Sequence, residues 1–274
     1  MKTSRKYSPL LLALLLGAAA CAVRCVLMFL YSDEQGEYSG SRAVLYILAA
    51  VLIAALVLYA LWTRKRFGEL NTRIFCGGDF ASVFVYACVG FFQLFSLAFM
   101  AYALVSGSPF FEGDSTAADL LIMLASLFTA LLFFIKATGK EKALKRSPFY
   151  ALLYIFPVGW SLIRLFVLFV EYSTMALYTA QKLRVLSLVV LTVYFLYEAR
   201  LYYAPRPMKL STYISVSALT VVLVPLSALP SFLKSLFLNE SANLGEPILC
   251  LVELAMCAVA AAGLANALKA KEEE

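Results

Sequence analysis

One arginine lies well inside an apolar stretch of the chain and is the residue best placed to bind a ligand. The stretch at 157–172 is hydrophobic enough to lie in a bilayer, yet it carries Arg164. At helical spacing Trp160, Arg164 and Glu171 share one side, so the polar groups form a stripe. An arginine at the bilayer centre costs about 2.5–3.5 kcal/mol on insertion scales, so a partner or a ligand must offset that cost.

Two more charges are predicted at the depth of Arg164. Arg24 and Arg164 each lie seven residues before the end of an apolar stretch, and Glu253 lies six residues after Pro247 begins another. At a rise of 1.5 Å per residue, all three would lie ~9–11 Å below the outer face of the membrane. Small residues at 17–20 and 258–263 would let the first and last stretches approach closely. We therefore predict that Glu253 lies within salt-bridge distance of Arg24 or Arg164. Arg24 is the natural partner, and a pair with Arg24 would leave Arg164 with a spare charge.

A spare buried arginine suits a carboxylate or a phosphate, which its planar fork can hold with two hydrogen bonds. Trp160 lies one turn away and would supply a ring face for a cation or a ligand. The predicted ligand-binding residues are Arg164, Glu253, Arg24 and Trp160. The competing interpretation is structural, because a membrane arginine can also extend toward the interface or pair with a fixed acid.

Several kinds of chemistry have no support in this sequence. The chain has no histidine, which removes histidine-based catalysis and histidine metal ligands. Its six cysteines include no CxxC pair, and no serine or cysteine has a visible base. We therefore expect no catalytic residues, no metal site and no cofactor, and we predict that the protein is not an enzyme.

The composition predicts a membrane protein built from helices. The chain has 274 residues, of which 63% are hydrophobic and only 15% are charged, far from the values of soluble domains. Continuous apolar stretches of roughly 20 residues recur along it, as expected of transmembrane helices and not of barrel strands. The predicted spans are 9–31, 42–62, 80–105, 117–136, 148–171, 183–203, 212–233 and 247–268.

The charges of the loops orient these eight spans. The segments 1–8, 63–78, 136–147, 200–210 and 269–274 hold 17 of the 23 lysines and arginines, while the alternate loops are mainly acidic. The positive-inside rule places both termini in the cytoplasm. The net charge of +6 therefore reflects membrane topology, and we expect no nucleic-acid partner.

The first and fifth spans share a pattern that raises the possibility of an internal repeat. Both open with Ser-Pro after a basic cluster, at Ser8 and Ser147, and both then carry one arginine at a similar distance. The repeat would divide a single integral membrane domain, 1–274, into parallel four-helix halves, 1–143 and 144–274. The simpler interpretation is that apolar helices resemble one another by composition.

The first hairpin also resembles known proteins of unassigned activity. A basic N-terminus, an apolar helix with Arg24 and the acidic turn Asp33-Glu34-Gln35-Gly36 resemble uncharacterised polytopic membrane proteins of Gram-positive, clostridia-like bacteria. The similarity covers this hairpin best and the stretch 160–166 less well. It implies a multi-pass protein of a bacterial plasma membrane, and it implies no chemistry.

Two functions fit these features. The first is a small-molecule or lipid-handling membrane protein, such as a transporter, with an anion-preferring site in the outer half of the bundle. Its partners would be the lipid bilayer and a small anionic ligand or lipid. The alternative is a structural, assembly or sensing membrane protein that transports nothing. A polar cavity reaching Arg164 favours the first, and a dry, packed core favours the second.

Overall fold

The structure of the protein is a computed structural model that describes most of the chain. The described residues are 8–31, 42–67, 71–72, 79–106, 116–139, 147–173, 179–203, 208–237 and 245–270. The basic N-terminus and the acidic turn at 33–36 lie outside these residues.

Helices make up nearly all of the described chain. They are α1 (Ser8–Tyr31), α2 (Arg42–Phe67), α3 (Phe80–Ser106), α4 (Thr116–Ala137), α6 (Pro148–Leu153), α7 (Ile155–Ser173), α8 (Thr179–Tyr203), α9 (Leu210–Phe237) and α10 (Gly245–Ala270). The described residues form eight segments that are long and apolar enough to cross a membrane, with α6 and α7 sharing one. The prediction of an all-α bundle with eight spans is confirmed.

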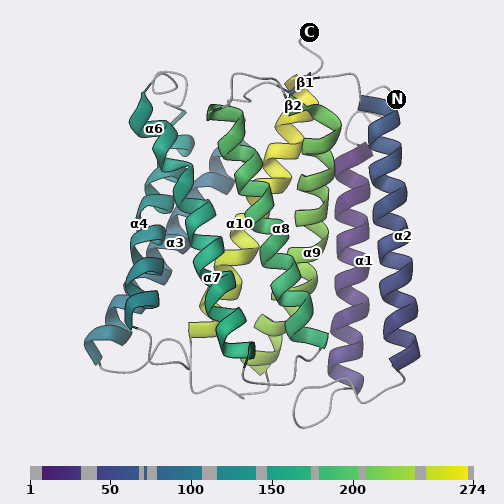
Figure 1. The fold of residues 1–274 in the computed structure, drawn as a ribbon, viewed down its shortest axis with the longest axis horizontal. Helices are drawn as coiled ribbons and strands as arrows, with labels where there is room; N and C mark the ends of the chain where they lie inside the picture. Colours follow the sequence, from purple (N-terminus) through teal and green to yellow (C-terminus); the bar gives the residue numbers. More distant parts are fainter. Residues whose placement is uncertain are drawn as a thin grey trace.

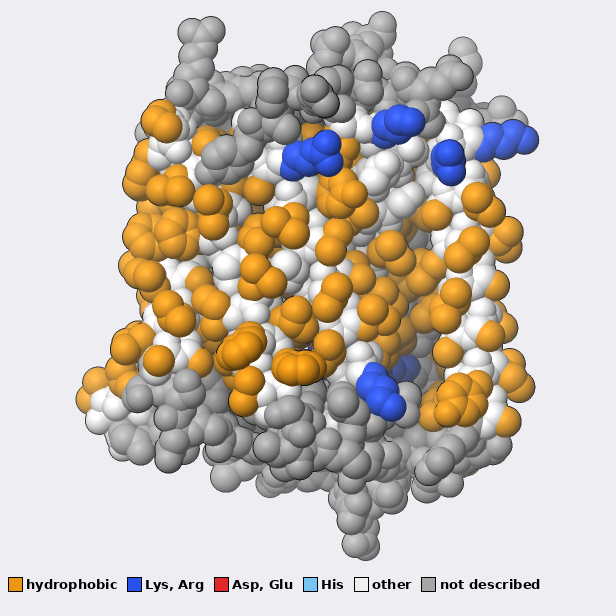
Figure 2. Space-filling model, viewed as in Figure 1, with side chains coloured by type: hydrophobic (Ala, Val, Ile, Leu, Met, Phe, Trp, Pro, Cys, Tyr) orange, Lys and Arg blue, Asp and Glu red, His pale blue; other side chains and the backbone are white. Residues whose placement is uncertain are grey.

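The ends of the bundle differ in what they carry. α1 begins and α10 ends at the same end (Figure 1). We call this end inner, after the sidedness predicted from the loop charges, and the opposite end outer. Two short strands, β1 (Asn71–Thr72) and β2 (Met208–Lys209), pair antiparallel at the inner end. Hydrophobic side chains cover the middle of the face shown in Figure 2, as expected of a surface in contact with lipid.

Six of the spans form a closed ring. In order around the ring, α3 packs against α4, α4 against α7, α7 against α8, α8 against α9, α9 against α10, and α10 against α3. The helices α9 and α10 are the most buried of the described spans. Many polar side chains of these six helices are buried. Those with no exposed surface include Gln93, Ser96, Ser126, Thr129, Ser161, Ser217 and Thr220.

The first two spans lie outside the ring. Both α1 and α2 pack against α9, and α1 meets α10 only marginally. The first and eighth spans do touch, as predicted, but the main partner of the first span is α9 and not α10. The helix contacts also differ between the two halves, since α8 packs between α7 and α9 whereas α2 has its main contact with α9. The internal repeat thus stays a prediction.

A proline explains why the fifth span is divided into two helices. Pro157 has no backbone N–H, so the carbonyl of Leu153 cannot receive its usual helical hydrogen bond. α6 ends at Leu153, and the backbone N–H of Tyr154 turns back to the carbonyl of Ala151 at 3.1 Å.

A second proline accounts for the tight contact between α1 and α9. Pro225 leaves the carbonyl of Val221 without its helical partner. Gly17 packs directly against this carbonyl, since a Cβ added at position 17 would lie 3.0 Å from the Val221 oxygen. Cys21, one turn further along α1, donates its thiol to the Pro225 carbonyl at 3.4 Å. Glycine at position 17 is therefore required for the close approach of the two backbones.

Gly17→Ala is expected to lower the thermal unfolding midpoint in detergent, because the new methyl group pushes α1 from α9. Overpacking of this kind costs about 1–3 kcal/mol. Gly159→Ala is the matched control, since a Cβ there meets nothing within 4 Å. This control should keep or raise the midpoint, because alanine favours helix. Equal midpoints for the two variants would contradict the packing argument.

Candidate functional site

The outer half of the ring holds a cluster of four buried or half-buried charges. Arg164 extends from α7 and Arg184 from α8, and both face α10, which supplies Glu246 and Glu253. We call these four residues the outer quartet. Glu253 and Arg164 have no exposed surface, whereas the side chain of Glu246 is 39% exposed.

Each glutamate of the outer quartet contacts both arginines. Arg164 Nη2 lies 2.5 Å from Glu246 Oε2, and Arg164 Nε lies 3.7 Å from Glu253 Oε1. Arg184 forms an ion pair with Glu246, and its Nη2 lies 3.3 Å from both Glu253 Oε1 and the sulfur of Cys250. The two arginines and the two glutamates therefore give the outer quartet no net charge. The half-exposed Glu246 is the member of the outer quartet that reaches the outer surface.

The predicted reach of Glu253 is confirmed for Arg164, while the preferred pairing with Arg24 is not found. Glu253 pairs with Arg184 and Arg164, whereas no acidic side chain in the described part of the chain lies within ion-pair distance of Arg24. Arg24 is half-buried on α1, and its Nη1 is buried there without a hydrogen bond. The physical reason is that α1 packs chiefly on α9 and only marginally on α10, the helix that carries Glu253. The prediction of a spare charge on Arg164 is therefore wrong.

Trp160 is buried, but it hydrogen-bonds to another helix and does not face the ligand site predicted at Arg164. Its indole Nε1 donates to the Ser126 hydroxyl of α4 at 3.1 Å. The ring thus links α7 to α4, while Arg164, one turn along, faces α10. No contact between Trp160 and the outer quartet supports its predicted role in ligand binding.

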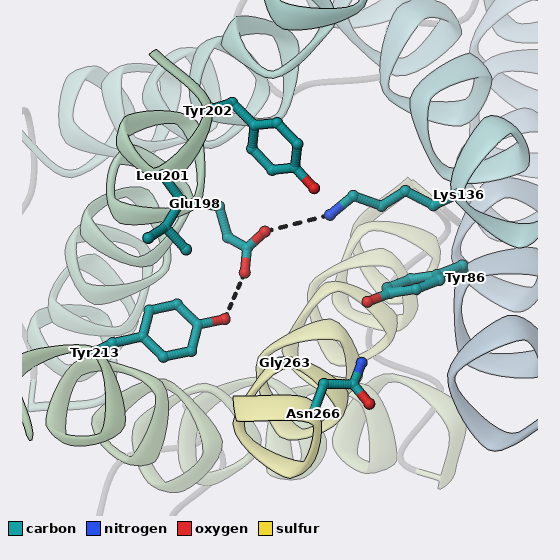
Figure 3. A pocket seen from close by; sticks show the side chains of 8 residues that line it. All are labelled: Tyr86, Lys136, Glu198, Leu201, Tyr202, Tyr213, Gly263 and Asn266. Atoms are coloured by element: carbon teal, nitrogen blue, oxygen red, sulfur yellow. Dashed lines mark hydrogen bonds and ion pairs between the residues drawn. The ribbon is translucent and has the colours of Figure 1, made fainter. Parts of the chain in front are cut away.

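A second buried pair lies at the inner end of the same ring. Lys136 extends from the last turn of α4, and its Nζ lies 3.2 Å from Glu198 Oε2 on α8. The other carboxylate oxygen, Oε1, accepts hydrogen bonds from Tyr194 at 2.9 Å and from Tyr213 at 2.5 Å. Figure 3 shows the carboxylate of Glu198 between the ammonium group of Lys136 and the hydroxyl of Tyr213. We call Lys136 and Glu198 the inner pair.

Aromatic rings surround the ammonium group of the inner pair. The Nζ of Lys136 lies 4.7 Å from the ring centre of Tyr154 and 5.2 Å from that of Tyr86. Phe133 and Tyr202 follow at 6.0 Å each. Ring faces attract cations, so this cage lowers the cost of burying the lysine.

A small polar pocket lies beside the inner pair. It is lined by Tyr86, Lys136, Glu198, Leu201, Tyr202, Tyr213, Gly263 and Asn266. The space open to the centre of a water molecule is about 10 Å³, which corresponds to roughly one bound water. Asn266 accepts a hydrogen bond from Ser82 at 3.1 Å through its Oδ1, while its Nδ2 is buried without a hydrogen-bond partner.

The outer quartet and the inner pair are connected by a shared helix. Arg184 and Glu198 are 14 residues apart on α8, which places them on nearly the same face and ~21 Å apart along the helix axis. Between them, Ser187 of α8 accepts a hydrogen bond from Ser227 of α9 at 2.7 Å. One face of α8 therefore carries polar groups from the outer end of the ring to the inner end.

The chain matches no protein-family model, no curated protein sequence and no solved structure. The eight spans define an integral, multi-pass membrane protein. The resemblance to clostridial membrane proteins, the location in a bacterial plasma membrane and the absence of enzymatic activity all stay predictions.

Proposed function

We propose that the protein is a transporter of small polar solutes, in which the six-helix ring encloses the path. The observation that carries this proposal is the charged interior of the ring, which has the outer quartet near one end and the inner pair near the other. Ionisable residues inside a bundle are typical of solute and ion pathways. Ion pairs at two depths act as two gates, and the described state has both gates closed.

The outer quartet supports a role as the outer gate. Glu246 holds both arginines from the first turn of α10 and is half-exposed, so outer water can reach it. An incoming carboxylate or phosphate would take the place of Glu246 on the fork of Arg164. The anion preference expected in the outer half thus depends on displacement of Glu246 and not on a spare arginine.

The competing function is a structural or sensing role. It is favoured by the packing of Arg164, which has no exposed surface and pairs with Glu246 and Glu253, so that its charge is balanced without a ligand. The two functions differ in one measurable property: a transporter must expose the outer quartet to water in one of its states, and a structural bundle keeps it closed.

Cys250 is a natural reporter for this difference, because it is buried beside Arg184. In a variant that keeps Cys250 as its sole cysteine, Glu246→Gln should speed labelling by a membrane-impermeant thiol reagent from the outer side at least tenfold. Glu198→Gln should slow the same labelling at least threefold, since weakening the inner gate favours the state that is open inward. The measurement is the labelling rate in sealed vesicles.

Arg66→Gln is the control for this experiment, because Arg66 lies outside the ring on α2 and bonds to Ser8. It should leave the rate unchanged. A Cys250 labelling rate that does not respond to either gate variant would exclude alternating access and would favour the structural role.

A further inference from the structure

The pocket beside the inner pair has room for roughly one water in the described state, so a larger ligand can enter only when Lys136 and Glu198 separate. We propose that the inner pair opens to bind a small zwitterion, a molecule with one carboxylate and one ammonium group. This inference rests on the proposed function and names the class of its solute.

The charges of the inner pair support this choice. When Lys136 and Glu198 separate, each exposes one charge to the pocket that both of them line. A zwitterion placed between them would pair its carboxylate with Lys136 and its ammonium group with Glu198. Every buried charge keeps an opposite partner, so the site remains neutral with and without the ligand. An anion or a cation alone would leave one member of the inner pair without a partner.

The surroundings supply the remaining contacts. Asn266 is 93% buried and lines the pocket, and its Nδ2 donor has no partner. A ligand carboxylate next to Lys136 would accept this unused hydrogen bond. The rings around the ammonium group of Lys136 would remain beside a second cation and favour it in the same way.

The position of Lys136 allows the opening. The lysine extends from the last turn of α4, close to the inner surface, and α4 is followed by Gly139, whose φ of 68° turns the chain away from the helix. The four-carbon stem of a lysine near a helix end can extend toward the interface while its charge stays solvated. Glu198 has no such freedom, because the hydroxyls of Tyr194 and Tyr213 hold one of its oxygens.

The test is a binding measurement by calorimetry on the purified full chain in detergent, with three matched probes. Glycine carries both groups, methylammonium carries the ammonium group alone, and acetate carries the carboxylate alone. Glycine should bind at least tenfold more tightly than either of the others. Asn266→Leu should weaken glycine binding by roughly tenfold to a hundredfold, since it removes one hydrogen bond to a charged group.

The double variant Lys136→Met/Glu198→Leu should lose glycine binding. Because both charges are removed together, no buried charge is left unpaired and the protein should still fold. Arg66→Gln on α2, outside the ring, is the control and should bind glycine as the wild type does. Equal affinity for the three probes, or glycine binding that survives in the double variant, would overturn the inference. Neither result depends on Cys250 labelling, so a failure of this binding test leaves the two-gate proposal standing and can be told apart from a failure of the labelling test.

Discussion

Glu198→Leu is expected to lower the free energy of unfolding by about 3–5 kcal/mol, the range measured when one partner of a buried ion pair is removed. The change takes away the carboxylate that Lys136 contacts at 3.2 Å. It also removes the acceptor of the Tyr194 and Tyr213 hydroxyls. Lys136 is only 4% exposed, so bulk water cannot solvate its ammonium group in place of the lost carboxylate. Denaturant unfolding in mixed micelles measures the loss.

The double variant Lys136→Met/Glu198→Leu tests whether the instability of Glu198→Leu comes from the unpaired charge of Lys136. It should recover most of the stability lost in Glu198→Leu, because two apolar side chains of similar size can replace a buried pair at little cost. If the double variant is as unstable as the single one, the loss comes from the tyrosine hydrogen bonds and not from the lysine.

Glu253→Ala should have the second largest effect, again a loss of about 3–5 kcal/mol. Glu253 has no exposed surface and contacts both Arg164 and Arg184. Its removal leaves two buried guanidinium groups to share Glu246, so the outer quartet gains a net positive charge inside the bundle. The thermal midpoint of the solubilised protein should fall accordingly.

Glu246→Ala is the matched control for this prediction, because it removes the same charge from the same helix at a half-exposed position. We expect a loss of about 1 kcal/mol, as for partly solvated pairs. Adding Arg184→Met to Glu253→Ala should restore the balance of charge and part of the stability. A control as destabilising as Glu253→Ala would show that depth in the bundle does not determine the cost.

The spans could be predicted from the sequence because each depends on a local property, an apolar stretch of sufficient length. The predicted fourth span, 117–136, and the helix α4 differ by one residue at each end. The arrangement of the spans could not be predicted in this way. Small residues such as Gly17 indicate close packing, but the partner, Val221, is selected by a carbonyl that a proline frees in another helix.

Only part of the candidate site could be predicted, because only some of its charged residues lie inside apolar stretches. Arg164 and Glu253 could be found because they lie inside apolar stretches. Arg184 was missed because the sixth span was expected to start at 183, which placed this arginine at the membrane edge. α8 starts at Thr179, so Arg184 lies more than one turn inside the helix. Lys136 and Glu198 also lay near predicted span ends, where charged groups usually meet the interface, and only the ring packing buries them.

The placement of the first hairpin outside the ring has a consequence for the synthesis of the protein. α1 and α2 are made first and contact each other at their inner ends, where Tyr59 donates to the Pro9 carbonyl at 3.0 Å. Their main binding surface is α9, and the hydrogen bond from Cys21 to Pro225 joins residues 204 positions apart. At about 5–20 residues per second, the ribosome needs roughly 10–40 s to make that intervening chain. During this time the hairpin resides in the bilayer with Gly17 and Arg24 uncovered, so it needs lipid or an insertion factor to shield them until α9 arrives.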